Sequence, residues 1–271
     1  MQRQERIGDV RIAFDDQGAG AAVVMLHPFP FDGRIWADNI QPVINAGYRV
    51  ITLDYPGFGD SPAPPSILSI EQIGDLAAEL FEALKIETAA LVGLSMGGYV
   101  ALALAHRFPA RIWALVLADT RADADGPEAR QGRAAALNTI AEKGVGAYLR
   151  QSLPRLVSPH ASPPLLEGLF RLAERREHTL TTAIAALRDR PDRTHELTRI
   201  ACPTLVLVGA EDQVSPPGKM CEIAGAISGA RFTEIARAGH LSNIEAPADF
   251  NRAVIDFLRG VSAATRGSAT R

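Results

Sequence analysis

The sequence is poor in cysteine and in aromatic residues. Its two cysteines, Cys202 and Cys221, are too few among 271 residues for a disulfide framework, and neither stands in a metal-ligand pattern. We expect both to be small buried hydrophobic residues. Aromatic residues make up 6% of the chain, whereas hydrophobic residues as a whole make up 47%. The core of this globular protein is therefore expected to be mainly aliphatic.

Neither sign of charge dominates the chain. Its 28 basic and 31 acidic residues are mixed throughout and give a formal net charge of −3. This balance argues against nucleic acid or an anionic membrane surface as the partner. Charged residues also interrupt every apolar group in residues 1–25, so we expect no signal peptide and no membrane span. We predict a cytoplasmic protein with a small-molecule partner, and the sequence leaves its oligomeric state open.

Cofactor and repeat signatures are missing as well. The sequence contains no P-loop, no G-x-G-x-x-G after the first apolar runs and no His, Cys and Asp cluster with metal spacing. It shows no internal repeat with a period of 20 to 50 residues, which excludes solenoids and propellers. We therefore predict that the protein needs neither a cofactor nor a metal ion.

Apolar runs at regular intervals indicate a sheet of about eight strands. Two alternating segments, 2–7 and 10–15, flank Gly8 and Asp9, which predicts a β-hairpin at a sheet edge. More continuous Val, Ile and Leu runs are typical of parallel strands covered on both faces. These runs are 21–27, 48–55, 89–94, 112–120, 203–209 and 230–236.

Segments with helical periodicity alternate with these runs. They are 33–46, 69–84, 96–107, 216–227 and 246–259, and Ser69 with Gln72 forms a predicted capping box before the second. The alternation predicts the α/β class, with a mostly parallel sheet, helices on both faces and a site at the carboxyl ends of the strands.

One long stretch interrupts this alternation. Residues 120–202 are rich in Ala, Arg and Leu and contain no strand-like run, so we expect a helical cap over the carboxyl edge of the sheet. Residues 1–119 and 203–260 then form the core. The small, polar residues 261–271 are expected to be a flexible tail.

A single serine stands between glycines where a strand gives way to a helix. Gly93, Ser95 and Gly97 form G-x-S-x-G, with the run "AALVGL" before the serine and "MGGYVALALAH" after it. A sharp turn from strand to helix needs small neighbours and lifts the serine hydroxyl above the sheet. The context favours a nucleophile, although a serine that caps the helix is the alternative.

A serine hydroxyl needs a base, and a carboxylate must orient that base. His240 follows the last run and Asp212 follows the run 203–209, so both are expected at the same edge as Ser95. The order Ser, Asp, His matches one of the known arrangements of a catalytic triad. Asp119 at the end of the run 112–120 is the main alternative acid, and Glu211 is another.

The other histidines are weaker candidates for the base. His106 ends a predicted helix, and three more lie in the insertion among charged residues; these are His160, His178 and His195.

With these motifs in place, the chain resembles an α/β-hydrolase fold protein of the small, capped esterase and lactonase type over residues 3–260. The motifs that match are "LHPF", "DYPGFGDS", "GLSMGG", "GAEDQVSPP" and "AGHLSNIEAP". The last of these and "LADTRADAD" resemble stretches of 3-oxoadipate enol-lactonases.

The resemblance implies an oxyanion hole made of the backbone N–H groups of Met96 and Phe29. In this chain the residue after His27 is Pro28, which cannot donate a hydrogen bond. The resemblance also implies that His27 supports the oxyanion loop, and that Asp54 shapes the next turn together with its neighbouring glycines.

The implied function is hydrolysis of a small carboxylic ester or lactone through an acyl-enzyme at Ser95. The same triad also serves carbon–carbon bond hydrolysis, aminopeptidase action and perhydrolysis. A small-molecule receptor that retains the triad is the non-enzymatic alternative.

Overall fold

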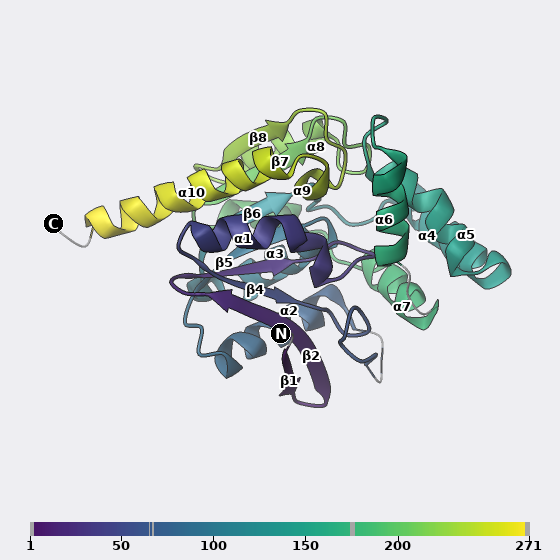
Figure 1. The fold of residues 1–271 in the computed structure, drawn as a ribbon, viewed down its shortest axis with the longest axis horizontal. Helices are drawn as coiled ribbons and strands as arrows, with labels where there is room; N and C mark the ends of the chain where they lie inside the picture. The colour runs from purple at the N-terminus through teal and green to yellow at the C-terminus, as the bar shows by residue number, and fades with distance from the viewer. Residues whose placement is uncertain (1–2, 65, 67, 174–176, 269–271) are drawn as a thin grey trace.

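In the computed structural model, residues 3–64, 66, 68–173 and 177–268 are described, with the backbone alone for 262–268. They form one sheet of eight strands, packed between helices (Figure 1). The strands are β1 Arg3–Ile7, β2 Val10–Gly18, β3 Ala22–Leu26, β4 Arg49–Leu53, β5 Ala89–Leu94, β6 Ile112–Ala118, β7 Thr204–Gly209 and β8 Arg231–Ile235.

The helices follow the strands along the chain. The α-helices are α1 Ala37–Asn45, α2 Ile70–Ala83, α3 Met96–Arg107, α4 Pro127–Lys143, α5 Val145–Ser152, α6 Pro163–Ala173, α7 Glu177–Arg188, α8 Pro217–Ala226, α9 Ser242–Glu245 and α10 Pro247–Ser268. Short 3₁₀ helices are η1 Gly33–Trp36, η2 Pro109–Arg111, η3 Leu153–Leu156 and η4 Thr194–Arg199. The predicted capping box of α2 is present, with reciprocal hydrogen bonds between Ser69 and Gln72.

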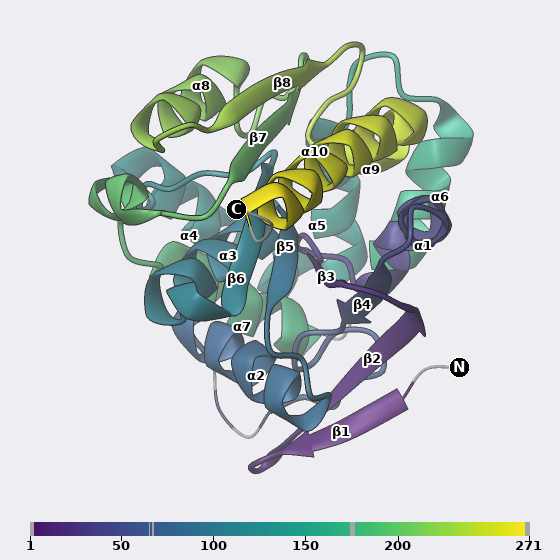
Figure 2. The same cartoon turned by 90° about the vertical axis from the view of Figure 1, so that its left-hand side faces the viewer.

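The strand order in the sheet is β1-β2-β4-β3-β5-β6-β7-β8, and the strands fan out from β1 to β8 (Figure 2). β1 and β2 form the expected hairpin at one edge, and β2 is antiparallel to β4. The remaining neighbours all pair in parallel. Six strands, β3 to β8, therefore run parallel to one another and point their carboxyl ends to the same side, where a site is expected.

Successive side chains of the inner strands face two separate cores. In β3, Val23 and Met25 pack with α1 and α10, whereas Val24 and Leu26 pack on the opposite face with α2, α3 and α8. Because side chains alternate along a strand and both faces are covered, these strands read as continuous apolar runs in the sequence.

The helices between β6 and β7 lie beyond one end of the sheet (Figure 1). They are α4, α5, α6 and α7, and no strand occurs in the described residues of this segment. We call residues 120–202 the cap.

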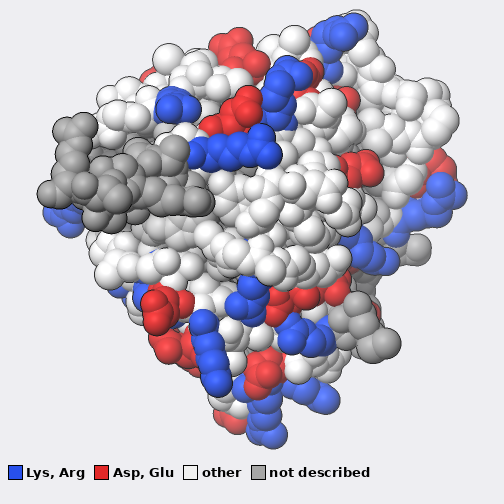
Figure 3. Space-filling model, turned by 60° about the vertical axis from the view of Figure 1, so that its left-hand side comes forward, with Lys and Arg blue, Asp and Glu red and all other residues white. Residues whose placement is uncertain are grey.

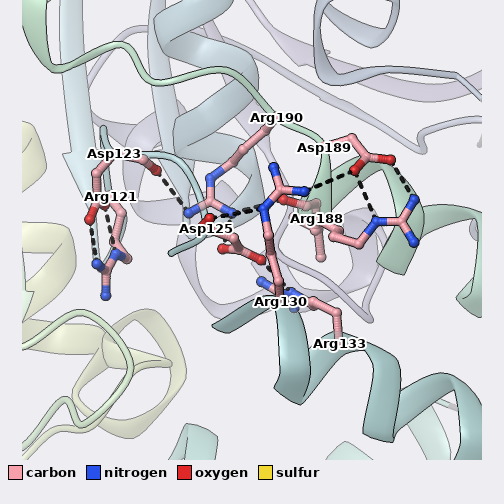
Figure 4. Close-up of polar contacts among 9 residues, drawn as sticks. Arg121, Asp123, Asp125, Arg130, Arg133, Arg188, Asp189 and Arg190 are labelled. Atoms are coloured by element: carbon pink, nitrogen blue, oxygen red, sulfur yellow. Dashed lines mark hydrogen bonds and ion pairs between the residues drawn. The ribbon is translucent and has the colours of Figure 1, made fainter. Parts of the chain in front are cut away.

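A buried ion pair fastens the end of the cap to its beginning (Figure 4). The Arg190 guanidinium, after α7, donates to Asp125, before α4, and both side chains are 4% exposed. Arg190 also lies over the ring of Tyr99 in α3, at 4.4 Å from the ring centre. Nearby, Arg193 donates to Glu71 in α2. The cap is thus held to two helices of the core.

The structure corrects several details of the expected fold. The run 230–236 was expected to be covered on both faces, but among the described residues β8 is the edge strand, paired with β7 alone, and only Ile235 of its five residues is buried. Cys221 is exposed on α8 and Cys202 is half-buried, so neither is a buried core residue. The last helix continues to Ser268, through most of the expected tail; residues 269–271 lie outside the described residues.

The surface carries charges of both signs. On the face in Figure 3, Lys and Arg side chains lie among Asp and Glu side chains, without a broad field of one sign. Among the described residues, no helix is both long and apolar enough to span a membrane.

Candidate active site

Ser95 stands on the sharp turn between β5 and α3. Its backbone has φ 53° and ψ −114°, a strained conformation for a residue other than glycine. Hydrogen bonds hold this conformation in place, since the Ser95 N–H donates to the Ala118 carbonyl and the Ser95 carbonyl accepts from the Thr120 hydroxyl. The end of β6 therefore fastens the turn, as expected for a serine presented for reaction.

Close packing explains why the residue at position 97, two residues after Ser95, is a glycine. A Cβ at Gly97 would lie 1.9 Å from the carbonyl oxygen of Leu26 at the end of β3. Any larger residue would push α3 away from the sheet. The same contact brings the loop after β3 close to the first turn of α3.

The three predicted triad residues lie in contact. The Oγ of Ser95 is 2.8 Å from His240 Nε2, and His240 Nδ1 is 2.8 Å from Asp212 Oδ2. An ionised carboxylate can only accept, so Nδ1 of His240 carries the proton and Nε2 is free to accept from the serine hydroxyl. His240 is 2% exposed, and this chain of hydrogen bonds is sheltered from water.

The environment of Asp212 keeps its carboxylate ionised. Burial by itself would raise the pKa of Asp212, but the charge and hydrogen bond of His240 and the N–H groups of Ser215 and Val214 outweigh burial and lower it. Those two N–H groups donate to Oδ1 at 3.0 and 2.7 Å, which leaves Oδ2 for the imidazole.

Asp119, the alternative acid, has different partners. Its Oδ1 accepts from the Gly209 N–H at 2.7 Å, and its Oδ2 is hydrogen-bonded to the Ser242 hydroxyl. Complete burial and the nearby charge of Asp212 raise the pKa of Asp119 well above its usual value. Of the two acids, Asp212 contacts the His240 imidazole, and Asp119 holds the loop that follows His240.

The loop after β3 is held by His27. Its buried ring accepts from the Tyr55 N–H at Nε2 and, with the proton then on Nδ1, donates to the Pro28 carbonyl at 3.1 Å. That loop tightens further where the Phe31 N–H donates to the Pro28 carbonyl. These bonds make His27 a support of the loop.

Two backbone N–H groups are the expected donors of an oxyanion hole. They belong to Met96, the first residue of α3, and to Phe29, in the loop after β3. The first amide groups of a helix have no acceptor inside the helix and favour negative charge nearby. Pro28 removes one donor, yet the next amide stays available.

Apolar side chains of the cap surround Phe29. The side chains of Ile140, Leu180 and Ile184 form a buried cluster, against which Phe29 and Tyr148 pack. These residues come from α4, α7 and α5. The cap therefore gives the candidate site an apolar wall.

The structure places the other candidates away from Ser95. Four histidines are exposed: His106, His160, His178 and His195. Three of them, His106, His160 and His195, have a ring nitrogen 3.5 to 3.9 Å from a glutamate oxygen, a common arrangement at a protein surface. Trp36 is buried beneath α10 and Trp113 donates to the Ala22 carbonyl, so both belong to the scaffold.

Sequence reasoning missed one residue beside the site. The Glu245 carboxylate accepts from the Gly239 N–H, next to His240, and from the Ser158 N–H of the cap. Its place in "GHLSNIEAP" was a signal, but no pattern in the sequence pairs it with residue 158. Among the described residues, no three His, Cys, Asp or Glu side chains form a group that could hold a metal ion.

Comparison with known proteins identifies the family of the chain. The family model described as alpha/beta hydrolase fold matches residues 21–247. The 2-hydroxy-6-oxo-6-phenylhexa-2,4-dienoate hydrolase of Comamonas testosteroni is 31% identical, with 94% of each chain covered. A thermophilic esterase from Thermogutta terrifontis has a TM-score of 0.90 and 33% identity, with 96% of this chain and 99% of that one covered.

The enol-lactonase from Burkholderia xenovorans LB400 has a TM-score of 0.87 and 28% identity, with 95% of this chain and 100% of that one covered. The expected fold class is thus confirmed by the sheet, by the family match and by neighbours that span nearly the whole chain. The chain belongs to the α/β hydrolase fold family, whose members similar to it include an esterase, an enol-lactonase and a dienoate hydrolase.

Proposed function

We propose that the protein hydrolyses a small carboxylic ester or lactone through a covalent acyl-enzyme. The observation that carries this proposal is the continuous path from Ser95 Oγ through His240 to Asp212, with 2.8 Å at each step. A nucleophile, its base and the group that orients the base are the parts that acyl transfer requires.

The reaction proceeds in two halves. Ser95 Oγ attacks the carbonyl carbon while His240 Nε2 takes the hydroxyl proton, and the oxyanion of the tetrahedral intermediate is held by the N–H groups of Met96 and Phe29. The C–O bond to the leaving group breaks, and His240 returns the proton to that oxygen. Water then attacks the acyl-enzyme by the same path and releases the acid.

The apolar wall of the cap bears on the substrate class. The half-buried Phe29 side chain packs on the buried cluster of Ile140, Leu180 and Ile184, so a substrate group above the oxyanion hole would meet the apolar Phe29 ring. This environment favours an ester or lactone with an apolar acyl or alkyl group. It also lowers the local dielectric constant, which strengthens the hydrogen bonds to an oxyanion.

Carbon–carbon bond hydrolysis is the second candidate, because a relative with 31% identity is a dienoate hydrolase. The dienoate in its name is a carboxylate, whereas the wall beside Phe29 is apolar. A substrate panel decides between the two. Neutral p-nitrophenyl esters and lactones should be turned over faster than 2-hydroxy-6-oxodienoates, and the reverse order would favour the second candidate.

The test of the proposal compares wild type with Ser95→Ala on short p-nitrophenyl esters and lactones. The exposed Ser228, in the loop after α8, supplies a matched control as Ser228→Ala. We expect many turnovers from wild type and the control, and a loss of about 10⁴-fold or more in Ser95→Ala. Equal activity in the two variants would reject this mechanism. A single slow turnover with retained product would instead favour the receptor.

A further inference from the structure

A carboxylate outside the triad grips the loop that carries His240. Glu245 ends the short helix α9, five residues after the histidine. Its Oε1 accepts from the Gly239 N–H at 2.8 Å, and its Oε2 accepts from the Ser158 N–H at 2.7 Å. The residue before His240 and one residue of the cap therefore both donate to Glu245.

The cap segment lies directly on that loop. A Cβ at Gly239 would lie 2.5 Å from the Ser158 nitrogen and 2.5 Å from the Val157 carbonyl carbon. Ser158 is 5% exposed and Val157 is 6% exposed. Glycine at position 239 thus permits a backbone contact between cap and core at the residue before the histidine.

The part of the loop after His240 is held to the core by other hydrogen bonds, so the contact of Glu245 with the cap can be tested separately. The Ser242 hydroxyl is hydrogen-bonded to Asp119, directly after β6, and His240 itself donates to Asp212. These bonds tie the loop to the core alone. Glu245 adds a hydrogen-bonded connection between the loop and the cap.

We propose that Glu245 is a positioning residue that fixes the backbone next to His240 to Ser158 of the cap, so that the imidazole reaches Ser95 only while this cap segment is docked. The inference rests on the proposed function, since it assigns the task of holding the base. Glu245 touches no substrate in this account. Its effect passes through the orientation of the imidazole, and a misplacement of about 1 Å can lower a rate about 100-fold.

Chemistry at both oxygens explains why the residue is a carboxylate. Each oxygen accepts from a different segment, and an amide of the same shape offers one acceptor and two donors. Burial raises the pKa of Glu245, while the N–H groups of Ser158 and Gly239 favour the ionised form. Replacement by glutamine therefore keeps one of the two connections and turns the other into an N–H facing an N–H.

The experiment compares Glu245→Gln with wild type, with Asp249→Asn as control. Asp249 lies four residues later in the first turn of α10 and pairs with Arg252 at the surface. Active sites are counted by fluorophosphonate titration, so kcat is expressed per reactive serine. We expect kcat of Glu245→Gln to fall about 10- to 100-fold with KM little changed, and the control to match wild type.

A second readout does not depend on turnover. Amide hydrogen exchange at Gly239 and Ser158 should be about tenfold faster in Glu245→Gln and unchanged in the control. A variant with wild-type kcat and wild-type exchange would overturn the inference. A group that only stabilised the fold would lower the number of titrated sites and leave kcat per site unchanged, which would also overturn it.

Two further measurements keep the test decisive. Glu245→Asp retains the charge but is one methylene shorter, so it should show an intermediate kcat and faster exchange at one of the two amides; wild-type behaviour in both would count against the inference. If wild type and Ser95→Ala prove equally inactive on every substrate, the proposed function fails, and exchange at Gly239 and Ser158 still decides whether Glu245 clamps the loop.

Discussion

Replacing Asp212 with asparagine should remove the base without disturbing the geometry of the site. Oδ1 of Asp212 accepts from Val214 N–H at 2.7 Å and Ser215 N–H at 3.0 Å, while Oδ2 faces His240 Nδ1. The asparagine oxygen must take the place that faces two donors, so its NH₂ group points at the imidazole. Nδ1 then has to accept, and the ring proton moves to Nε2, where it faces Ser95.

A protonated Nε2 cannot accept the serine proton. The wrong tautomer is known to cost about 10⁴-fold in kcat in a serine protease triad, and the same loss here corresponds to about 5 kcal/mol of transition-state stabilisation. The assay is the initial rate on the best p-nitrophenyl ester for Asp212→Asn and wild type, at equal concentrations of folded protein. The KM should change little, because Asp212 lies behind the imidazole.

Asp119→Asn supplies the matched comparison. An asparagine at this position can accept from the Gly209 N–H and donate to the Ser242 hydroxyl, so it preserves both hydrogen bonds of Asp119. It also replaces a carboxyl whose pKa is raised well above normal by burial. We expect a loss of less than about tenfold. A large loss in Asp119→Asn together with a small one in Asp212→Asn would refute the assignment of the acid.

Three further predictions concern the scaffold. Gly97→Ala should yield insoluble or inactive protein, because its Cβ would lie 1.9 Å from the Leu26 carbonyl oxygen; an active, soluble variant would contradict this. Arg190→Met should lower the free energy of unfolding, measured in urea, by about 3 kcal/mol, because the buried Asp125 carboxylate loses this ion pair. Replacing Arg190 and Asp125 together should lower the free energy of unfolding less than replacing Arg190 alone. Hydrogen bonding and charge from Arg49 and Arg3 lower the pKa of Asp16, so the stability that Asp16 contributes is complete above the ordinary Asp pKa and is lost as pH falls through the folded pKa. The difference in urea midpoint between wild type and Asp16→Asn should therefore close between neutral and acidic pH. A difference that stays constant would contradict the pairing with these arginines as the source of stability.

Local sequence patterns were enough to predict the strands and the candidate site residues that follow them. Continuous Val, Ile and Leu runs reflect burial on both faces, and Gly97 reflects a close approach of two backbones. Ser95, Asp212 and His240 each follow a parallel strand, so the rule that such ends share an edge brings them together before any distance is known. Their catalytic roles stay predictions.

Long-range pairing is what the sequence could not supply. The partners Arg190 and Asp125 are 65 positions apart, and Glu245 and Ser158 are 87 apart. Nothing in the local sequence of either segment indicates its partner, because the partner of a buried charge lies on a different element that packs against it. The exposure of β8 escaped prediction for the same reason, since an apolar run does not say whether another strand will pair beyond it.

The central claim is that His240 activates Ser95 as a nucleophile. Mass spectrometry of the protein after reaction with a fluorophosphonate tests it most directly, on wild type, Ser95→Ala and His240→Ala. The account predicts one adduct per wild-type chain, located on the peptide that contains Ser95, no adduct in Ser95→Ala and a much slower reaction in His240→Ala. An adduct on another residue, or equal labelling of all three proteins, would contradict it.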